Sequence, residues 1–412
     1  MIRSGFKLML AAALLLTLSA CEPAGYETIQ AHPAGDVSTH SLRPPVPAGA
    51  RSSRDAVLKP LSVKATVKVA LLLPITGRNA DLGRALQDAA TVSLFDKYAS
   101  LSPEAARTRM ELVPYDTGDT PEQARDAASE AIEDGALLLI GPVFSDATQA
   151  VAPIAEAAGI NVISFSNNIT VARPGVYLFG FSPEAQAKRV IGYAQSQGRN
   201  QLAALVPNSA YGQAVLDAAR TEITAKGGAL IAQSLYSPQG VGVETAVDSI
   251  IPQGQPPAFD SLFLPEGGNA LSTLLRTLRN RGVQGASVQL LGTGLWDDPT
   301  LISRVNLDGA WFATSPPQLT YAFETRFRNT YKYQPPRVAS LAYDAVALAV
   351  TIATSGRQFT QATLTSPTGF SGPANGIFRF KKNGTSERGL AVLAVSGGAF
   401  EMISPSPVSF VQ

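Results

Sequence analysis

Short apolar runs alternate with helical periods along most of the chain, from about residue 63 onward. Residues 67–74 form an apolar run that ends at a proline, as expected of a strand buried in a parallel sheet. Leu82, Leu86, Ala90 and Leu94 then recur at helical spacing and place one apolar stripe along a helix. This alternation of strands and helices predicts an α/β fold with parallel sheets.

The strand–helix alternation occurs in two series, which predicts two lobes with a cleft between them. Further strands are predicted at 110–115, 136–140 and 161–164, and then at 202–206, 229–235, 259–264 and 288–291. We expect the first lobe to hold about 63–180 plus returning segments, and the second about 185–320. A nearly all-apolar helix over 338–352 should be buried. Residues 376–380 and 390–395 flank Asn383-Gly384 and predict a β-hairpin.

The first 21 residues have the pattern of a lipoprotein signal peptide. Arg3 and Lys7 precede an apolar run from Leu8 to Leu18 that is too short for a bilayer span, which needs about 20 residues. The run ends in Leu18-Ser19-Ala20-Cys21, which resembles a bacterial lipobox, so we expect Cys21 to be lipidated and to anchor the protein to a membrane. The alternative is an ordinary secretory signal with a chance cysteine at the boundary.

Residues 22–62 are predicted to form a flexible tether. They contain six prolines with several Gly, Ser and Thr residues and no apolar period: Pro23, Pro33, Pro44, Pro45, Pro47 and Pro60. The folded domain is therefore predicted to span 63–405.

Composition indicates a binding protein and argues against an enzyme. Lys and Arg total 33 against 32 Asp and Glu, so a nucleic-acid partner, which needs clustered positive charge, is not expected. Cys21 is the single cysteine, and both histidines, His32 and His40, precede the predicted fold. This excludes Ser-His-Asp and Cys-His catalysis there, and most zinc, haem and iron–sulfur chemistry. Neither G-x-G-x-x-G after the first strand nor a P-loop is present, and we expect no cofactor or metal.

Candidate ligand-binding residues follow the predicted strands, because ligands of such folds bind beyond the carboxyl ends of the strands. Thr76 and Arg78 follow the first strand, and Gly141 and Ser145 follow the third. A helix predicted to begin there would offer free N–H groups and a positive dipole end to a carboxylate or phosphate. Alternatively, Ser145 only caps that helix.

Ser164 and Asn167 follow the fourth strand, where they are suited equally to hydrogen bonding a ligand and to a turn.

The second series contributes three further candidates. Tyr211, at a predicted helix start, is suited to stacking on a ligand and donating its hydroxyl, or to plain packing. Glu266 is a candidate acceptor in the cleft, or a first-turn residue that complements a helix dipole. Trp296 is a candidate cleft residue, or part of the core.

Several of these motifs, in this order, resemble type I periplasmic binding proteins of the Leu/Ile/Val-binding group. The matching segments are Leu71-Leu72-Leu73-Pro74-Ile75-Thr76-Gly77, Gly141-Pro142 with Ser145, Ile163-Ser164, Tyr211-Gly212 and Ala342-Tyr343-Asp344-Ala345. The resemblance covers about 63–405 and implies a two-lobed fold with two parallel, Rossmann-like sheets and a cleft between them.

Within that group, three segments are most similar to lipoproteins that activate penicillin-binding proteins. They are Tyr115-Asp116-Thr117-Gly118, Phe179-Gly180-Phe181-Ser182-Pro183-Glu184 and Ala204-Leu205-Val206-Pro207. This resemblance implies a periplasmic, lipid-anchored activator of a peptidoglycan synthase, at the outer membrane more than at the inner.

The alternative function is a solute-binding lipoprotein of an ABC transporter for amino acids, amides or small peptides. The resemblance places the acidic residue that would meet a ligand ammonium near Ala270, which carries no charge. An ammonium buried without an anionic partner costs several kcal/mol. A free amino acid is therefore disfavoured as the ligand.

Overall fold

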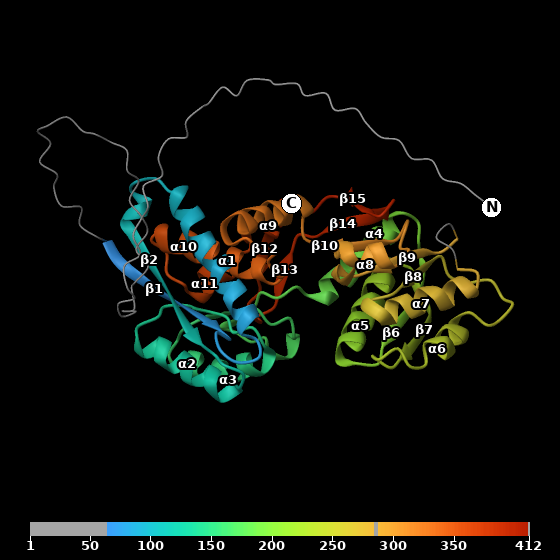
Figure 1. The fold of residues 1–412 in the computed structure, drawn as a ribbon, viewed down its shortest axis with the longest axis horizontal. Helices are drawn as coiled ribbons and strands as arrows, with labels where there is room; N and C mark the ends of the chain where they lie inside the picture. Colours follow the sequence, from blue (N-terminus) through green and yellow to red (C-terminus); the bar gives the residue numbers. More distant parts are fainter. Residues whose placement is uncertain (1–63, 284–286, 411–412) are drawn as a thin grey trace, which may run out of the picture. The chain divides into compact units, whose positions relative to one another are not determined.

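The computed structural model describes residues 64–283 and 287–410, which form the two largely parallel sheets predicted from the sequence (Figure 1). The predicted signal peptide, lipidation of Cys21 and tether lie outside the described residues. None of the helices in the described ranges is both long and apolar enough to cross a membrane.

The first lobe is built on a five-stranded parallel sheet with the strand order β2-β1-β3-β4-β5. Its strands are β1 (Lys64–Leu73), β2 (Thr108–Asp116), β3 (Leu139–Ile140), β4 (Val162–Ser164) and β5 (Val176–Leu178). The apolar run of β1 is fully buried, since Ala70, Leu72 and Leu73 expose none of their surface. Helices cover both faces of this sheet, which explains the continuous apolar run from Val69 to Leu73 in β1.

Each face of the first sheet packs against its own set of helices. One face contacts α1 (Ala80–Ala99), α9 (Pro317–Tyr331) and α10 (Ala339–Thr354), and the other contacts α2 (Pro121–Glu133) and α3 (Ser145–Ala157). Helix α10 lies in the core as predicted, because apolar residues occupy all of its sides. Short elements complete the lobe: η1 (Ala105–Arg107), η2 (Ile169–Val171) and α11 (Gln361–Leu364).

The second lobe is built on a seven-stranded sheet with the order β15-β14-β10-β9-β8-β6-β7. The strands are β6 (Gln201–Pro207), β7 (Ala229–Tyr236), β8 (Ser261–Phe263), β9 (Gln289–Gly292), β10 (Trp311–Thr314), β14 (Ala391–Ser396) and β15 (Ala399–Ser404). Strands β6 to β10 are parallel to one another. At one edge β14 pairs antiparallel with β10, and β15 pairs antiparallel with β14.

Helices also cover both faces of the second sheet. One face packs on α4 (Pro183–Ser196) and α5 (Ala210–Ala225), and the other packs on α6 (Val243–Ile250), α7 (Gly268–Asn280) and α8 (Pro299–Arg304). The turn η3 (Gly294–Trp296) follows β9 at the carboxyl edge of this sheet.

The predicted hairpin of 376–380 with 390–395 is wrong in its second strand. Strand β12 (Gly376–Phe380) instead pairs on its two sides with β11 (Phe370–Gly372) and β13 (Ser386–Arg388), in a small sheet that packs on the first lobe. The chain then crosses between the lobes, and β14 joins β10 in the second sheet. It also crosses after β5 and after β10, so the junction of the lobes contains segments far apart in the sequence.

Candidate functional site

The loops after β3 and β4 form one unit at the carboxyl edge of the first sheet. Gly141 has φ +98°, and a Cβ there would lie 2.1 Å from the Leu72 carbonyl oxygen, so the position requires glycine. The Ser164 hydroxyl donates to the Pro142 carbonyl at 3.1 Å and lies 2.7 Å from the Thr148 hydroxyl. Ser164 is fully buried, so in this structure its hydroxyl holds the two loops together.

Ser145 is the first residue of α3, and the interpretation of Ser145 as the helix cap is wrong. The capping position is Phe144, which makes no side-chain cap. The amides of the first turn have no acceptor within the helix, and among the described contacts the Ser145 hydroxyl has no hydrogen bond. The Asp146 carboxylate accepts a hydrogen bond from the Ala147 amide at 2.8 Å. The start of α3 therefore keeps donors available for an anionic group.

Thr76 and Arg78 are tied to the loop after β2. Asp116 accepts hydrogen bonds from the Thr76 amide at 3.2 Å and from its hydroxyl at 2.5 Å. Burial raises the pKa of Asp116, but hydrogen bonds from Thr76 and from nearby amides outweigh it and lower the pKa below its usual value. The Arg78 amide donates to Asp119 at 2.8 Å, whereas the Arg78 side chain is 85% exposed.

Asn167 is exposed just after β4, and its side chain makes no hydrogen bond to the rest of the described chain.

Tyr211 and Glu266 lie near each other at the carboxyl edge of the second sheet. The Tyr211 hydroxyl lies 3.2 Å from that of Thr293, and burial, with the nearby charges of Glu266 and Glu184, raises the pKa of Tyr211 to about 12. Glu266 accepts hydrogen bonds from the Tyr236 hydroxyl at 2.9 Å and from the Gly267 amide at 3.0 Å. Glu184, which was not among the predicted site residues, adds a second carboxylate near Tyr211.

Trp296 belongs to the core and does not line the cleft. It exposes none of its surface and packs edge-on against Phe312, with ring centroids 6.5 Å apart. Its indole N–H donates to the Glu266 carbonyl at 2.9 Å. This hydrogen bond therefore fixes the backbone position of Glu266.

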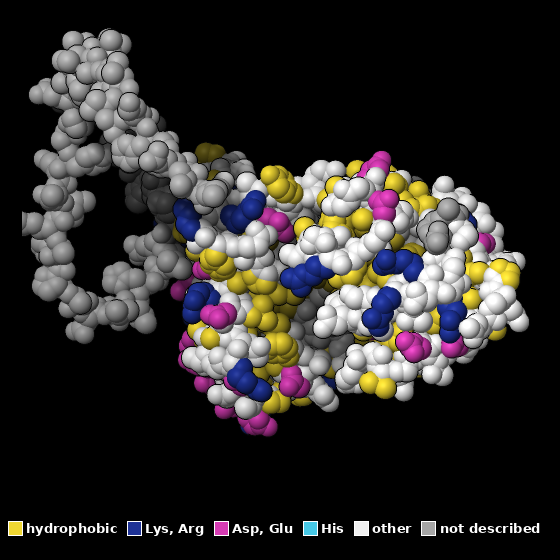
Figure 2. All heavy atoms as spheres, turned by 45° about the vertical axis from the view of Figure 1, so that its right-hand side comes forward, with side chains coloured by type: hydrophobic (Ala, Val, Ile, Leu, Met, Phe, Trp, Pro, Cys, Tyr) yellow, Lys and Arg dark blue, Asp and Glu magenta, His cyan; other side chains and the backbone are white. Residues whose placement is uncertain are grey.

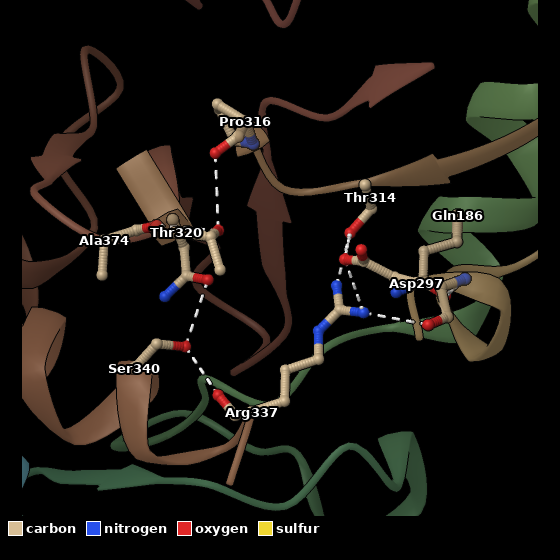
Figure 3. Close-up of polar contacts among 10 residues, drawn as sticks. Gln186, Asp297, Thr314, Pro316, Thr320, Arg337, Ser340 and Ala374 are labelled. Atoms are coloured by element: carbon tan, nitrogen blue, oxygen red, sulfur yellow. Dashed lines mark hydrogen bonds and ion pairs between the residues drawn. The ribbon is translucent and has the colours of Figure 1, made fainter. Parts of the chain in front are cut away.

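Arg337 connects the lobes, and no local pattern in the sequence identified it. Its guanidinium lies 2.9 Å from the Asp297 carboxylate and donates to the Gly294 carbonyl at 2.9 Å (Figure 3). A further hydrogen bond of 2.5 Å goes to the Thr314 hydroxyl. Gln186 accepts from the Gly294 amide at 2.9 Å, so first-lobe Arg337 and second-lobe Gln186 hold opposite sides of η3.

Asp344 and Arg388 are buried charged residues near Arg337. Asp344 exposes none of its surface and accepts hydrogen bonds from the Ala374 amide at 2.7 Å, the Asn375 amide at 3.0 Å and the Asn375 side chain at 2.9 Å. Burial raises the pKa of Asp344 to about 6. Arg388 donates to the Phe179 carbonyl at 2.5 Å and stacks on the Phe179 ring, and burial lowers its pKa to about 10.

The Arg337 junction lies at the carboxyl edge of the second sheet, next to Phe181 in the segment that leaves β5. Figure 2 shows the surface hollowed between the lobes, with apolar side chains along one wall. No group of three or more His, Cys, Asp or Glu side chains in the described part of the chain is arranged to hold a metal ion. The donors at α3, together with the tyrosine and carboxylates opposite, are suited to binding a small polar ligand.

Comparison with known proteins supports the same fold. The periplasmic binding protein family matches residues 66–399. A crystal structure of a putative branched-chain amino acid ABC transporter protein from Rhodospirillum rubrum superposes with a TM-score of 0.73 at 21% identity, over 82% of this chain and 100% of that one. LivJ of Streptococcus pneumoniae, in complex with isoleucine, gives 0.58 at 18% identity, over 83% and 100%.

Curated sequence relatives include penicillin-binding protein activators. LpoA of Klebsiella pneumoniae is 28% identical over 219 residues, which are 53% of this chain and 27% of the activator. The chain spans about a fifth to a half of the length of the first curated relatives that it matches. The chain belongs to the periplasmic binding protein family, with the type I fold of the branched-chain amino acid binding proteins and a distant relationship to LpoA.

Proposed function

We propose that this protein binds a small carboxylate-bearing solute between its lobes and delivers it to an ABC transporter. The observation that carries the proposal is the start of α3, where the Ser145 hydroxyl and the Ser145 and Asp146 amides lack acceptors among the described residues, although the Ala147 amide donates to Asp146. A helix N-terminus of this kind stabilises a carboxylate by hydrogen bonds and by its dipole. The isoleucine in the LivJ complex carries such a carboxylate.

The second lobe would contact the other end of the ligand. Tyr211 is half-buried near Glu184 and Glu266, so a neutral phenol and two carboxylates share this region. Glu266 already accepts two hydrogen bonds, whereas Glu184 accepts one, from the Ser182 hydroxyl at 2.7 Å. Carboxylates here favour a ligand whose far end carries N–H donors. Glu184 and Glu266 offer the negative charge that Ala270 lacks, so amino acids are tested together with amides and small peptides.

Replacing Ser145 with alanine should weaken ligand binding about ten- to a hundredfold, because a hydrogen bond to a charged group is worth about 1.5–3 kcal/mol. Calorimetric titration measures the change once a thermal-shift screen of amino acids, amides and small peptides has found a ligand. Ser129→Ala is the control, since Ser129 lies on α2 and its hydroxyl donates to the Arg125 carbonyl at 3.1 Å. Equal affinities of S145A and wild type would contradict this placement of the carboxylate.

A second candidate function is activation of a peptidoglycan synthase. Its support is the similarity to LpoA, together with the activator-like segments of the sequence. Adding the purified chain to a purified class A penicillin-binding protein tests it. The activator function predicts faster glycan polymerisation or cross-linking whether or not a solute is present. No change in rate, combined with tight solute binding, would leave transport as the function.

Both functions place the protein in the periplasm on a lipid anchor, and we propose Cys21 as the attachment site. Cys21→Ser should abolish incorporation of radiolabelled palmitate and release the protein from the membrane fraction, since two or more acyl chains are needed for stable attachment. Fractionation of the wild type by density separates the outer membrane, which we favour, from the inner. Full labelling of C21S would contradict the assignment.

A further inference from the structure

Strand β7 forms an open edge of the second sheet. It pairs with β6 on one side, and no other strand of the described chain pairs with it on the other side. The Tyr236 carbonyl accepts a hydrogen bond from the Asn208 amide, directly after β6, so the backbone groups of Tyr236 point toward β6. Neighbouring residues of a strand point their backbone groups to opposite sides, so the N–H and C=O groups of Leu235 and Gln233 point to the open edge. Such a row of backbone groups is a template for another strand.

Strand β7 lacks the features that protect an edge strand from pairing. Its eight residues, Ala229–Tyr236, include neither a charged residue nor a proline. The other edges of the two large sheets are protected, since β15 carries Glu401, β2 carries Arg109, Glu111 and Pro114, and β5 is only three residues long. Charges, prolines and short length are the devices that keep edge strands from associating. Among these four edges, pairing with another strand is therefore least opposed at β7.

Apolar side chains are exposed along the same strand. Ile231 is 44% exposed and Leu235 is 41% exposed, and Gln233 lies between them on the same face. The Gln233 side chain accepts a hydrogen bond from Arg220 at 2.8 Å, which identifies this face as the one that carries α5. The open edge thus offers an apolar, a polar and an apolar side chain in turn.

This order of side chains is complementary to itself. When two copies of β7 pair antiparallel about Gln233, the two Gln233 residues lie opposite each other, and Ile231 of each copy lies opposite Leu235 of the other. Arg220, which contacts Gln233, is already paired with Asp217 at 3.2 Å, so no unpaired cation is brought to the two-fold axis. Two-fold dimers, which use the same patch on both copies, are the commonest symmetric oligomers.

We propose that β7 is a dimer interface, at which a second copy of this chain pairs antiparallel about Gln233 and joins the two seven-stranded sheets into one. The dimer buries the exposed Ile231 and Leu235 side chains in cross-strand pairs and satisfies the outward backbone groups of the edge. A single pair of short strands is a small interface, so we expect association at micromolar or higher concentrations. Ile231, Gln233 and Leu235 are not residues of the proposed solute site, so the dimer does not depend on the solute.

Sedimentation equilibrium of the full-length protein between about 1 µM and about 1 mM should show a reversible equilibrium of monomer and dimer. Hydrogen exchange at the Gln233 and Leu235 amides should slow as the dimer forms, whereas the Ser234 amide, which points toward β6, should exchange at an unchanged rate. A chain that stays monomeric over this range would overturn the proposal. A dimer that leaves the Gln233 and Leu235 amides unprotected would overturn it as well.

The pairing about Gln233 is tested by two variants with opposite charges. Ile231→Lys and Leu235→Glu should each weaken the dimer about tenfold or more, because each places a charge against an apolar side chain of the other copy. A mixture of the two variants should associate, since the introduced lysine then faces the introduced glutamate. Met402→Lys is the matched control, because Met402 is 40% exposed on β15, at the opposite edge of the same sheet. Dimers of I231K as tight as those of the wild type, or a mixture no tighter than the single variants, would contradict this pairing.

Discussion

Replacing Asp344 with alanine is expected to lower the free energy of unfolding by about 3 kcal/mol or more at pH 7. The substitution leaves the Ala374 amide and both Asn375 donors without their acceptor, at about 1–3 kcal/mol each. It also removes the negative charge that opposes buried Arg388. These losses outweigh the gain from no longer burying a carboxylate, a burial that raises the pKa of Asp344.

Chemical denaturation of the variant and the wild type measures this effect. Asp81→Ala is the control, because the Asp81 side chain is 97% exposed and forms a surface pair with Arg84. A loss below about 1 kcal/mol for D344A would show that its hydrogen bonds do not hold the turn between β11 and β12.

The difference in free energy of unfolding between wild type and D344A should be larger at pH 4.5 than at pH 7. The pKa of Asp344 rises from 3.8 in the unfolded chain to about 6 in the fold, so between these values the folded state holds more protons. The stability contributed by this carboxyl is therefore fully present below about pH 4 and is lost as the pH rises through about 6. Denaturation at both pH values measures the gap, and a gap that widens toward pH 7 would contradict the assignment.

Replacing Arg337 with methionine is expected to cost about 1–2 kcal/mol and to loosen the junction of the lobes. The substitution removes the contacts to Asp297, the Gly294 carbonyl and the Thr314 hydroxyl. A fully buried pair would lose about 3–5 kcal/mol, but these side chains are 27% and 23% exposed, and solvent screens the pair.

A double-mutant cycle with Asp297→Asn isolates the ion pair, and we expect a coupling energy of about 1 kcal/mol. Hydrogen exchange at η3 should accelerate in R337M. The control is Arg326→Met, which removes an ion pair of 2.7 Å to Asp96 within the first lobe and should leave η3 unchanged. Coupling near zero, or equal exchange at η3 in both variants, would contradict a role of Arg337 in joining the lobes.

The architecture was predictable where local periodicity is strong. The apolar runs of β1 and β6 and the stripe of α1 identified parallel strands and helices, because burial on both faces demands such patterns. Strands β5 and β10 were missed, although β3, β4 and β9 are as short and were predicted. The Asn383-Gly384 turn and β12 were located correctly, but the second strand was not, because β12 pairs with β13 and β14 pairs with β10 in the other lobe.

The candidate site was predictable only in part. The rule that ligands bind at the carboxyl ends of strands placed Gly141, Ser145 and Tyr211 without any knowledge of their contacts. Arg337 and Arg388 could not be found in this way, since their partners lie far away in the sequence. Trp296 was a candidate cleft residue but is fully buried, because residue type alone does not distinguish an aromatic cleft residue from a core residue.

The most direct test is a crystal structure of the chain grown with a mixture of amino acids, amides and small peptides at saturating concentration. The proposed binding function predicts one ligand between the lobes, with its carboxylate against the Ser145 hydroxyl and the first-turn amides of α3. An empty cleft under these conditions, or a ligand bound with its carboxylate away from α3, would contradict it.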